Sequence, residues 1–399
     1  MLLHSPPYLF TSKVFRVLII GFLLITVSMQ YVNDPQTEDG DRQSVPPCPT
    51  ISPKLIGWTN LSAETMSSIL EEDENVVDLR MKEAGLEAGG KYEPKECRSH
   101  QRVAIIVPVR DRKEHLTVFL RYMHPFLQRK QMSYVIIVVE QSEHLPFNRG
   151  MLMNIGFKEV QLFEEKYQCL ILHDVDMLPE DDGNPYACPE EGRPRQMAFS
   201  MNYFKNYTPV GEGFFGAVTA ISTADFQRIN GLSNSFWGWG GEDENFYHRV
   251  IAQKLTVVRP FDGQPLHSVR YMMQSHKRAV PSPGRFDVMK GGRSGFQADG
   301  LVNLSYVTGV MSSNVFCLFT CQITYSKYFR IIKPFVAVVF PVSRSHFLTS
   351  GVLLALVPEA IVEVMLIRSS SAEVSGSLSS GTELSSWQTV TYSHNVNEQ

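Results

Sequence analysis

Three acidic residues follow directly on interleaved tryptophans and glycines in residues 236–244, which read FWGWGGEDE. Phe246, Tyr247, Val250 and Ile251 come next at helical spacing, which predicts that the acids occupy the first turn of a helix. The helix dipole favours negative charge there, glycine lets a ligand approach the backbone closely, and indole rings stack on the faces of sugars and bases. A helix start beside core tryptophans would explain the acids but not the glycines. The segment therefore favours a ligand-binding site.

A second acidic motif, His173-Asp174-Val175-Asp176, closes a short apolar stretch. A D-x-D pair at the end of a strand can present one carboxylate to a divalent cation and the other to a sugar. Carboxylate oxygens suit hard cations such as Mg²⁺ or Mn²⁺. Because surface loops contain many such pairs, a solvated turn leading into Pro179 is the alternative interpretation.

The imidazole of His276 is a third candidate for chemistry, because neutral histidine is a common metal ligand. A lone histidine is more often structural, however. Met273 lies three residues before it, and its sulfur is a soft donor that Mn²⁺ does not favour. From residue types alone, this pair stays ambiguous.

Residues 211–216 match the pattern G-x-G-x-x-G, but their context is wrong for a dinucleotide-binding turn. Such a turn opens a helix. Here the pattern leads into the strand-like residues 217–221 in the middle of the chain. We therefore exclude dinucleotide binding at this segment.

The chain before these motifs predicts an α/β fold with an open, Rossmann-like sheet. Strand and helix patterns alternate, in the order strand 103–107, helix 113–130, strand 134–139, helix 149–164 and strand 170–172. In such sheets ligands bind beyond the carboxyl ends of the strands. Three polar segments are therefore expected at one rim, and they are residues 108–112, 147–149 and 174–176.

The composition excludes several classes of protein. The 399 residues include 37 Lys and Arg against 41 Asp and Glu, so the basic excess of a typical nucleic-acid-binding protein is missing. Hydrophobic residues make up 43% and charged residues 20%, which excludes a mainly disordered chain and a polytopic membrane protein. The six cysteines include no CxxC pair, so a zinc finger is not expected.

The N-terminus predicts a membrane anchor. Residues 17–32 form an uncharged apolar run, which Lys13 and Arg16 precede and an acidic segment, residues 34–41, follows. Positive charge on the N-terminal flank predicts a cytosolic N-terminus and a lumenal body. We expect an uncleaved signal anchor because no clear cleavage site follows the run, and a cleaved signal peptide is the alternative. Either one leads the body into an oxidising compartment.

Taken together, these motifs resemble the β-1,4-galactosyltransferase family of Golgi type II membrane glycosyltransferases. The resemblance extends over about residues 48–325, and its most specific part is the string WGWGGED at 237–243. The other segments that carry it occur in family order, and they are 103–116 (VAIIVPVRDRKEHL), 147–149 (FNR), 173–179 (HDVDMLP), 215–222 (FGAVTAIS), the pair Met273 and His276, 285–287 (RFD) and 299–301 (DGL).

The resemblance implies a GT-A-type nucleotide-sugar transferase fold and an inverting, Mn²⁺-dependent transfer from a UDP-sugar donor to a glycan acceptor on a glycoprotein or glycolipid. It implies that Asp176, Met273 and His276 bind manganese and that Asp243 is the catalytic base. The residues implied for donor binding are Pro108, Val109, Arg110, Asp111, Arg112, Phe147, Asn148, Arg149, Val175, Asp176, Trp239 and His276. Those implied for acceptor binding are Phe214, Gly241, Glu242, Asp243, Glu244 and Arg285.

Phe214 bears on the choice of donor sugar. By the resemblance, galactose enzymes carry a bulky aromatic residue at this position and N-acetylgalactosamine (GalNAc) enzymes carry Leu or Ile. The phenyl ring therefore favours UDP-galactose as the donor. The resemblance implies a terminal N-acetylglucosamine (GlcNAc) or glucose as the acceptor. A β-1,4-N-acetylgalactosaminyltransferase and a non-catalytic sugar-binding protein are the alternatives. Ala217 replaces a family glycine near the acceptor.

The resemblance also implies the organisation of the chain and its disulfides. The expected segments are a cytosolic tail (1–13), a transmembrane signal anchor (14–32), a stem (33–47), a lumenal catalytic domain (48–328) and an unassigned C-terminal tail (329–399). The implied disulfides are Cys48–Cys97 and Cys169–Cys188, while Cys317 and Cys321 either pair with each other or stay free. Sequons at Asn60, Asn206 and Asn303 are predicted glycosylation sites and agree with a lumenal body.

Overall fold

The computed structural model describes residues 45–142, 145–259, 266–277, 279–282, 284–312 and 316–323. The predicted cytosolic tail, signal anchor and C-terminal tail lie outside these ranges, together with residues 33–44 of the predicted stem. Within the ranges, no helix combines the length and the apolar character that are needed to span a membrane.

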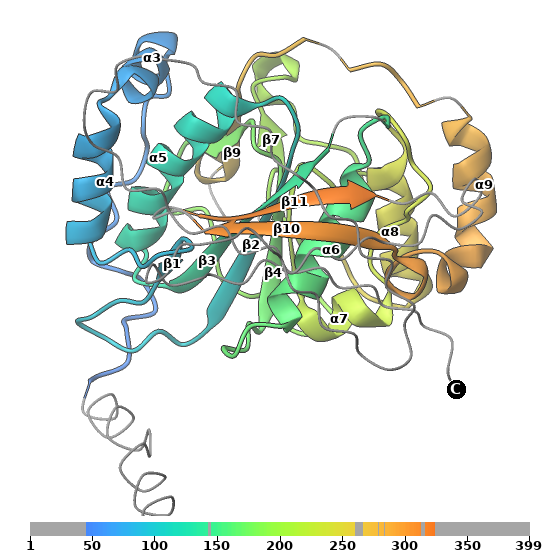
Figure 1. Ribbon diagram of the computed structural model, residues 1–399, viewed down its shortest axis with the longest axis horizontal. Helices are drawn as coiled ribbons and strands as arrows, with labels where there is room; N and C mark the ends of the chain where they lie inside the picture. Colours follow the sequence, from blue (N-terminus) through green and yellow to red (C-terminus); the bar gives the residue numbers. More distant parts are fainter. Residues whose placement is uncertain are drawn as a thin grey trace, which may run out of the picture.

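Three parallel strands form the centre of the main sheet (Figure 1). β2 (Arg102–Val109) pairs with β3 (Ser133–Gln141) on one side and with β4 (Cys169–His173) on the other. α5 (Lys113–Arg129) connects β2 to β3, and α6 (Arg149–Gln161) connects β3 to β4. These five elements confirm the predicted alternation of strands and helices and the open α/β sheet.

The edges of the sheet are partly antiparallel, which the sequence did not predict. β8 (Val218–Ser222) runs antiparallel to β4, and β6 (Arg195–Gln196) runs antiparallel to β8. On the other side, β11 (Cys317–Ile323) is parallel to β3 and antiparallel to β10 (Tyr306–Ser312), while β1 (Lys91–Tyr92) pairs antiparallel with β3. Antiparallel strands need no helical crossover, and only short strands and a 3₁₀ turn lie between β4 and β8.

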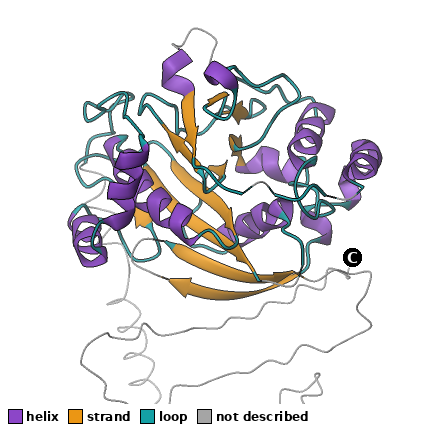
Figure 2. Cartoon of the chain, turned by 90° about the horizontal axis from the view of Figure 1, so that it is seen from above, coloured by secondary structure: helices purple, strands orange, loops and turns teal. Residues whose placement is uncertain are grey.

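The side chains of the central strands alternate between two apolar layers. In β2, Val103, Ile105 and Val107 face the layer that includes α5. Ala104 and Ile106 face the layer that includes α6. All five are at most 1% exposed, so the strand is buried on both faces, as its unbroken apolar run predicts. Figure 2 shows the strands between the two groups of helices.

A smaller sheet begins shortly after β4. In it, β9 (Arg270–Met273) lies between β5 (Met177–Pro179) and β7 (Ser200–Met201). β5 and β9 are antiparallel, and Met177 pairs opposite Met273. This register brings the end of β9 beside the D-x-D motif, although the two segments are far apart in the sequence.

The remaining helices surround these sheets. They are α3 (Ala63–Glu71), α4 (Glu74–Glu83), α7 (Thr223–Arg228), α8 (Glu242–Ala252), α9 (Arg285–Gly295) and the 3₁₀ helices η1 (Lys205–Tyr207), η2 (Leu266–Val269), η3 (Phe296–Ala298) and η4 (Leu301–Asn303). α3 and α4 lie at one end of the molecule, and α8 and α9 lie at the other (Figure 1).

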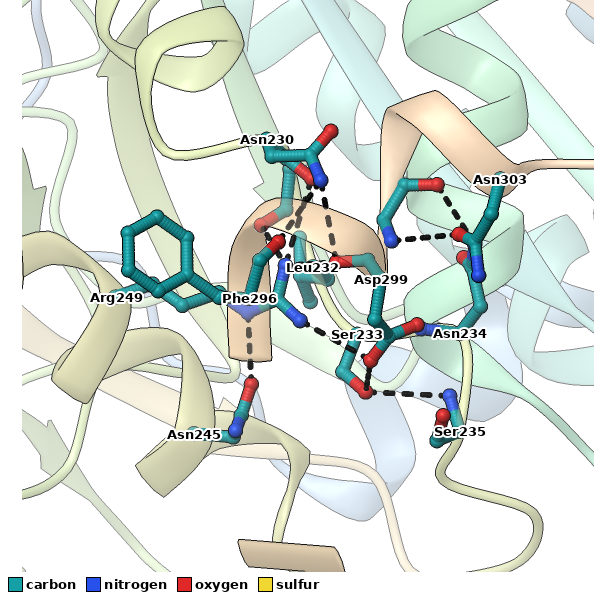
Figure 3. A network of polar contacts seen from close by, with 12 residues as sticks. Asn230, Leu232, Ser233, Asn234, Ser235, Asn245, Arg249, Phe296, Asp299 and Asn303 are labelled. Carbon is teal, nitrogen blue, oxygen red and sulfur yellow. Dashed lines mark hydrogen bonds and ion pairs between the residues drawn. The ribbon is translucent and has the colours of Figure 1, made fainter. Parts of the chain in front are cut away.

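A buried polar network ties α8 to the residues around η3 and η4 (Figure 3). The guanidinium of Arg249, a residue that is 1% exposed, pairs with Asp299 Oδ2 at 3.2 Å. It also donates to Asn245 Oδ1 at 2.9 Å and to the carbonyl of Gly231 at 3.1 Å. A buried charge is very costly unless it is paired and hydrogen-bonded. These contacts therefore restrict α8 to one position against its neighbours.

Both disulfides implied by the resemblance are confirmed. Cys48 is bonded to Cys97, and Cys169 of β4 is bonded to Cys188. Cys317 and Cys321 are buried and free, so the alternative in which they pair with each other is wrong.

Gly156 allows α6 to pack closely on the sheet, and its replacement tests that packing. A Cβ at this position would lie 2.4 Å from Ile106 Cγ2 and 3.1 Å from Val139 Cγ2. We expect Gly156→Ala to destabilise the fold by about 1–2 kcal/mol, because the overpacking cost exceeds the gain in helix propensity. Thermal unfolding would measure it. Gly211→Ala is the control, because a Cβ there meets nothing within 4 Å. Equal unfolding temperatures for the two variants would contradict the close packing.

Candidate active site

The D-x-D motif lies at the rim where β4 ends, as predicted. The Asp174 N–H donates to the carbonyl of Ala217 at 2.9 Å, and the Asp176 carbonyl accepts from the Gln274 N–H at 2.7 Å. Val175 between them is only 6% exposed. The motif is therefore part of the folded rim, and the alternative of a solvated turn is wrong.

Asp176 and His276 meet directly. Asp176 Oδ2 lies 2.9 Å from His276 Nε2, and the two side chains are 15% and 19% exposed. The hydrogen bond to Asp176 raises the pKa of the His276 imidazole. A carboxylate and an imidazole are suitable ligands for Mn²⁺ and related divalent cations, and partial exposure leaves room for a ligand to reach them.

Met273, the third ligand that the resemblance implies, ends β9 opposite Met177, the residue that follows the D-x-D motif. Its backbone is held by the Asn202 side chain, which accepts from the Met273 N–H at 2.7 Å and donates to its carbonyl at 3.3 Å. Among the described residues, no three His, Cys, Asp or Glu side chains gather as a metal site. The third ligand that the resemblance implies, the Met273 sulfur, is not one of these residue types.

Two arginines bring positive charge to the same corner. Arg112 Nη2 lies 3.2 Å from His276 Nδ1. Arg110 donates to the carbonyl of Leu145 at 2.6 Å, and its guanidinium carbon lies 5.4 Å from the centroid of the Phe147 ring. The two polar segments that follow β2 and β3 therefore meet beside the candidate cation site, and their charge suits an anionic ligand.

Three other residues of these segments build the frame of the site, and a fourth is exposed. Pro108 and Val109 are buried within β2. Asn148 is fully buried and caps α6, because its side chain accepts from the Met151 N–H at 3.0 Å. Asp111 is exposed and has a positive φ of 53°.

Arg149, the first residue of α6, bridges two carboxylates. Its Nε lies 2.6 Å from Asp174 Oδ1 and its Nη1 lies 2.9 Å from Asp243 Oδ1. The Arg149 side chain is 13% exposed, so the charges interact with little screening by water. From the sequence, Arg149 was expected to bind the donor. Its separation from the two acidic motifs along the chain gave no indication that its side chain would connect them.

Asp243 lies in the first turn of α8, as predicted from the sequence. The helix begins after Gly241, whose φ of 102° favours glycine. Gly216, just before β8, lies against the Asp243 carboxyl, because a Cβ at 216 would be 2.0 Å from Asp243 Cγ. Gly241 and Gly216 therefore allow the Asp243 carboxylate to take this position. In the sequence, the repeated glycines of residues 211–216 and 236–244 were the feature that could have indicated it.

The surroundings of Asp243 favour proton transfer. Burial raises the pKa of its carboxyl, the Arg149 guanidinium opposes this rise, and the carboxylates of Glu242 and Asp174 add to it. A carboxylate whose pKa is raised is a stronger base than an ordinary aspartate. The arrangement can therefore accept a proton from a hydroxyl group held beside it.

Groups suited to a sugar lie around the start of α8. The Trp239 side chain is 48% exposed, and the guanidinium carbon of Arg285 lies 5.8 Å from the centroid of its ring. Glu242 Oε2 is buried and has no hydrogen-bond partner within the described residues. An indole face, a guanidinium and an unpaired carboxylate oxygen can together bind an apolar sugar face and polar sugar groups.

Glu244 and Phe214 lie at the border of the sugar-suited side chains around the start of α8. The Glu244 side chain is 51% exposed, and its Oε1 lies 3.7 Å from His248 Nε2. Phe214 is half-buried and packs against the same core layer as Met273. It comes two residues before Gly216, so it is close in the chain to the residue that contacts Asp243.

The other sequence predictions concern surface features and the excluded motif. Asn60, Asn206 and Asn303 are all exposed. The Asn303 side-chain oxygen also accepts from Asn234 Nδ2 and from the Gly300 N–H, within the network of Figure 3. Residues 211–216 lead into strand β8, which confirms that no helix follows the G-x-G-x-x-G pattern.

Arg149→Met tests the bridge between the two carboxylates. Removal of the guanidinium leaves both without their main partner, so we expect a loss of about 3–5 kcal/mol in the free energy of unfolding. Adding Asp243→Asn to this variant should restore part of the loss, because one uncompensated charge is removed. Arg193→Met is the control, since its surface pair with Glu190 is exposed and worth about 0–1 kcal/mol. Equal denaturation midpoints for Arg149→Met and Arg193→Met would contradict the bridge.

Comparisons with known proteins match most of the described chain to galactosyltransferases. Residues 48–189 match the N-terminal region of glycosyl transferase group 7, and residues 195–277 match a profile described as the N-terminal domain of galactosyltransferase. Mus musculus β-1,4-galactosyltransferases 3 and 1 are each 38% identical over 267 residues, which is 66% of this chain and 64% and 63% of theirs. Homo sapiens β-1,4-galactosyltransferase 6 is 36% identical over 260 residues, or 65% of each chain. The matched segment thus spans less than two thirds of the length of these relatives.

Two solved structures of one Drosophila protein are also similar. The catalytic domain of Drosophila β-1,4-galactosyltransferase 7 in complex with xylobiose is 27% identical, with a TM-score of 0.48, and the match covers 56% of this chain and 95% of that chain. A variant of it in complex with manganese, UDP-Gal and xylobiose is 28% identical, with the same TM-score and coverage.

The family matches and the architecture agree. The two profile matches follow one another and cover the D-x-D motif, the FWGWGGEDE segment, Met273 and His276. The open α/β sheet, with the D-x-D motif at the end of a central strand, has the form expected of a GT-A-type fold. The chain therefore belongs to the β-1,4-galactosyltransferase family.

Proposed function

We propose that this chain is an inverting, Mn²⁺-dependent β-1,4-galactosyltransferase. It transfers galactose from UDP-galactose to a terminal GlcNAc or glucose of a glycoprotein or glycolipid glycan. The observation that carries the proposal is the position of Asp243, which Arg149 connects to the D-x-D motif at the same rim. Family membership supports the same reaction.

The donor side lies around the candidate cation site. Asp176, Met273 and His276 would hold Mn²⁺, because a carboxylate and an imidazole already meet there and Met273 pairs opposite Met177, the residue that follows Asp176. Bound there, the ion would offset the negative charge on the departing diphosphate. Arg110 and Arg112 add positive charge beside it, and the Phe147 ring offers an apolar face.

Asp243 acts as the base. The acceptor hydroxyl oxygen attacks the anomeric carbon of galactose from the face opposite UDP, so that one C–O bond forms as the bond to UDP breaks. The hydroxyl proton passes to the Asp243 carboxylate. Its raised pKa makes this transfer more favourable than it would be to an ordinary aspartate. Arg149 keeps the carboxylate in place.

The acceptor lies against the start of α8. Arg285 can donate hydrogen bonds to a substituent of the acceptor sugar, and Trp239 beside it offers an exposed indole face to the donor. The unpaired Glu242 Oε2 can accept a hydrogen bond from a sugar hydroxyl. Gly241 lets the acceptor approach the backbone, while Glu244 borders the site. Phe214 limits the space for the donor sugar and supports galactose over GalNAc.

The proposed setting is the Golgi lumen. The catalytic domain extends over residues 48–328, and residues 14–32 anchor it as a single-pass type II membrane protein. Two disulfides support an oxidising compartment. The exposure of the three sequon asparagines supports glycosylation there.

A donor-by-acceptor assay tests the reaction. With Mn²⁺, the full chain should release UDP from UDP-galactose in the presence of GlcNAc or glucose and form a β-1,4 linkage, and chelation of the metal should abolish turnover. Faster turnover of UDP-GalNAc would support the N-acetylgalactosaminyltransferase instead. Absence of UDP release with every donor and acceptor would favour a non-catalytic sugar-binding protein.

Asp243→Asn tests the base. The amide keeps the shape of the carboxylate but does not accept the proton, so kcat should fall by about 10²–10⁴-fold. UDP affinity in the presence of Mn²⁺, measured by calorimetry, should stay near that of the wild type. Glu190→Gln, which neutralises an exposed surface acid, is the control and should keep full activity. Normal turnover of Asp243→Asn would refute the assignment.

A further inference from the structure

Two buried glutamines make the same set of contacts on opposite sides of the site. Gln141 ends β3 and is 2% exposed, and Gln196 ends β6 and is 0% exposed. In each, both side-chain N–H groups donate to backbone carbonyls, and the side-chain oxygen accepts one backbone N–H. An amide side chain is uncharged and offers both functions, so each glutamine can fix a loop without adding charge to the site.

Gln141 holds the segment that precedes α6. Its Nε2 donates to the carbonyls of Leu145 at 3.2 Å and Pro146 at 3.0 Å, and its Oε1 accepts from the Asn148 N–H at 2.7 Å. Phe147 lies between these anchored positions, with its ring against Arg110. Gln141 therefore restrains the donor side of the site.

Gln196 holds the backbone behind the base. Its Oε1 accepts from the Gly216 N–H at 3.0 Å, and its Nε2 donates to the Gly216 carbonyl at 3.0 Å and to the Ala198 carbonyl at 2.9 Å. Gly216 lies against the Asp243 carboxyl, with no room for a Cβ between them. A shift of this backbone would move the surface against which Asp243 is placed.

We propose that Gln141 and Gln196 are positioning residues with separate tasks in the transfer reaction. Gln141 sets the affinity for the UDP donor through the segment 145–148. Gln196 sets the orientation of Asp243 through Gly216. The proposal rests on the proposed function, because it takes Asp243 as the base and the corner near Arg110 as the donor site.

The two glutamines are matched controls for each other. Gln141→Met and Gln196→Met remove the same number of hydrogen bonds from side chains of nearly equal burial, so a general loss of packing should affect both alike. In the full chain with Mn²⁺, we expect Gln141→Met to weaken UDP binding and raise the KM for UDP-galactose. We expect Gln196→Met to lower kcat by about 10–100-fold, as displacement of a reacting group does, with UDP affinity unchanged.

Three further variants keep the test decisive. Gly216→Ala places a methyl group on the Asp243 carboxyl and should reproduce the effect of Gln196→Met, with low kcat and normal UDP affinity. If the methionine variants fold poorly, Gln141→Glu and Gln196→Glu form a second matched pair, because each keeps the shape of the side chain but replaces its donor nitrogen with an oxygen and adds the same buried negative charge. The same loss of kcat and of UDP affinity in both glutamine variants would overturn the proposal.

The proposed function and the glutamine assignment can fail separately. Wild-type turnover is measured first, and its absence would refute the proposed function. In that case the task given to Gln196 fails with it, and calorimetric UDP affinities still test the task given to Gln141. A loss of UDP affinity confined to Gln141→Met supports that task, and an equal loss in both variants refutes it.

Discussion

The ion bridge of Arg149 is the interaction on which the site depends. Asp174 and Asp243 lie 25 and 94 residues away from Arg149 in the chain, and both would carry negative charge at one rim of the sheet. Without a cation between them, the two carboxylates would repel each other in a partly buried space where water screens charge weakly. The guanidinium offsets both charges and joins the end of β4 to the start of α8. It therefore links the donor motif to the residue proposed as the base.

Each end of this bridge belongs to a rigid part of the fold. Arg149 begins α6, which packs on β2 at a distance that only glycine at position 156 allows. Asp243 lies in the first turn of α8, which the buried Arg249 network fixes to the residues around Asp299 (Figure 3). A bridge between two fixed elements holds its carboxylates with little motion. This constraint matters because a base that is displaced by about 1 Å loses much of its effect.

The pattern of apolar and polar residues along the chain was sufficient to predict the central strands and the helices between them. The apolar runs of β2, β3 and β4, the amphipathic stretch of α5 and the helical stretch of α6 all formed as expected, and the strands are unbroken apolar runs because they are buried on both faces. Residues 217–221 were expected to be strand-like and form β8, but the antiparallel pairing of β8, β6 and β10 was not predicted. Their pairing depends on which edge of the sheet remains open after the central strands assemble. The residues of a short strand do not by themselves indicate which strand it will pair with.

The sequence by itself determined the chemistry available to this protein, since carboxylates, imidazole, indole and glycines appear in recognisable motifs. It also determined that the polar segments after the central strands would meet, because parallel strands end at one edge. Only the tertiary structure decided which groups touch. It paired Asp176 with His276, set Arg149 between two acidic motifs and placed Gly216 against Asp243. Such contacts join residues far apart in the chain, so they depend on the packing of α6 and α8 rather than on any local spacing.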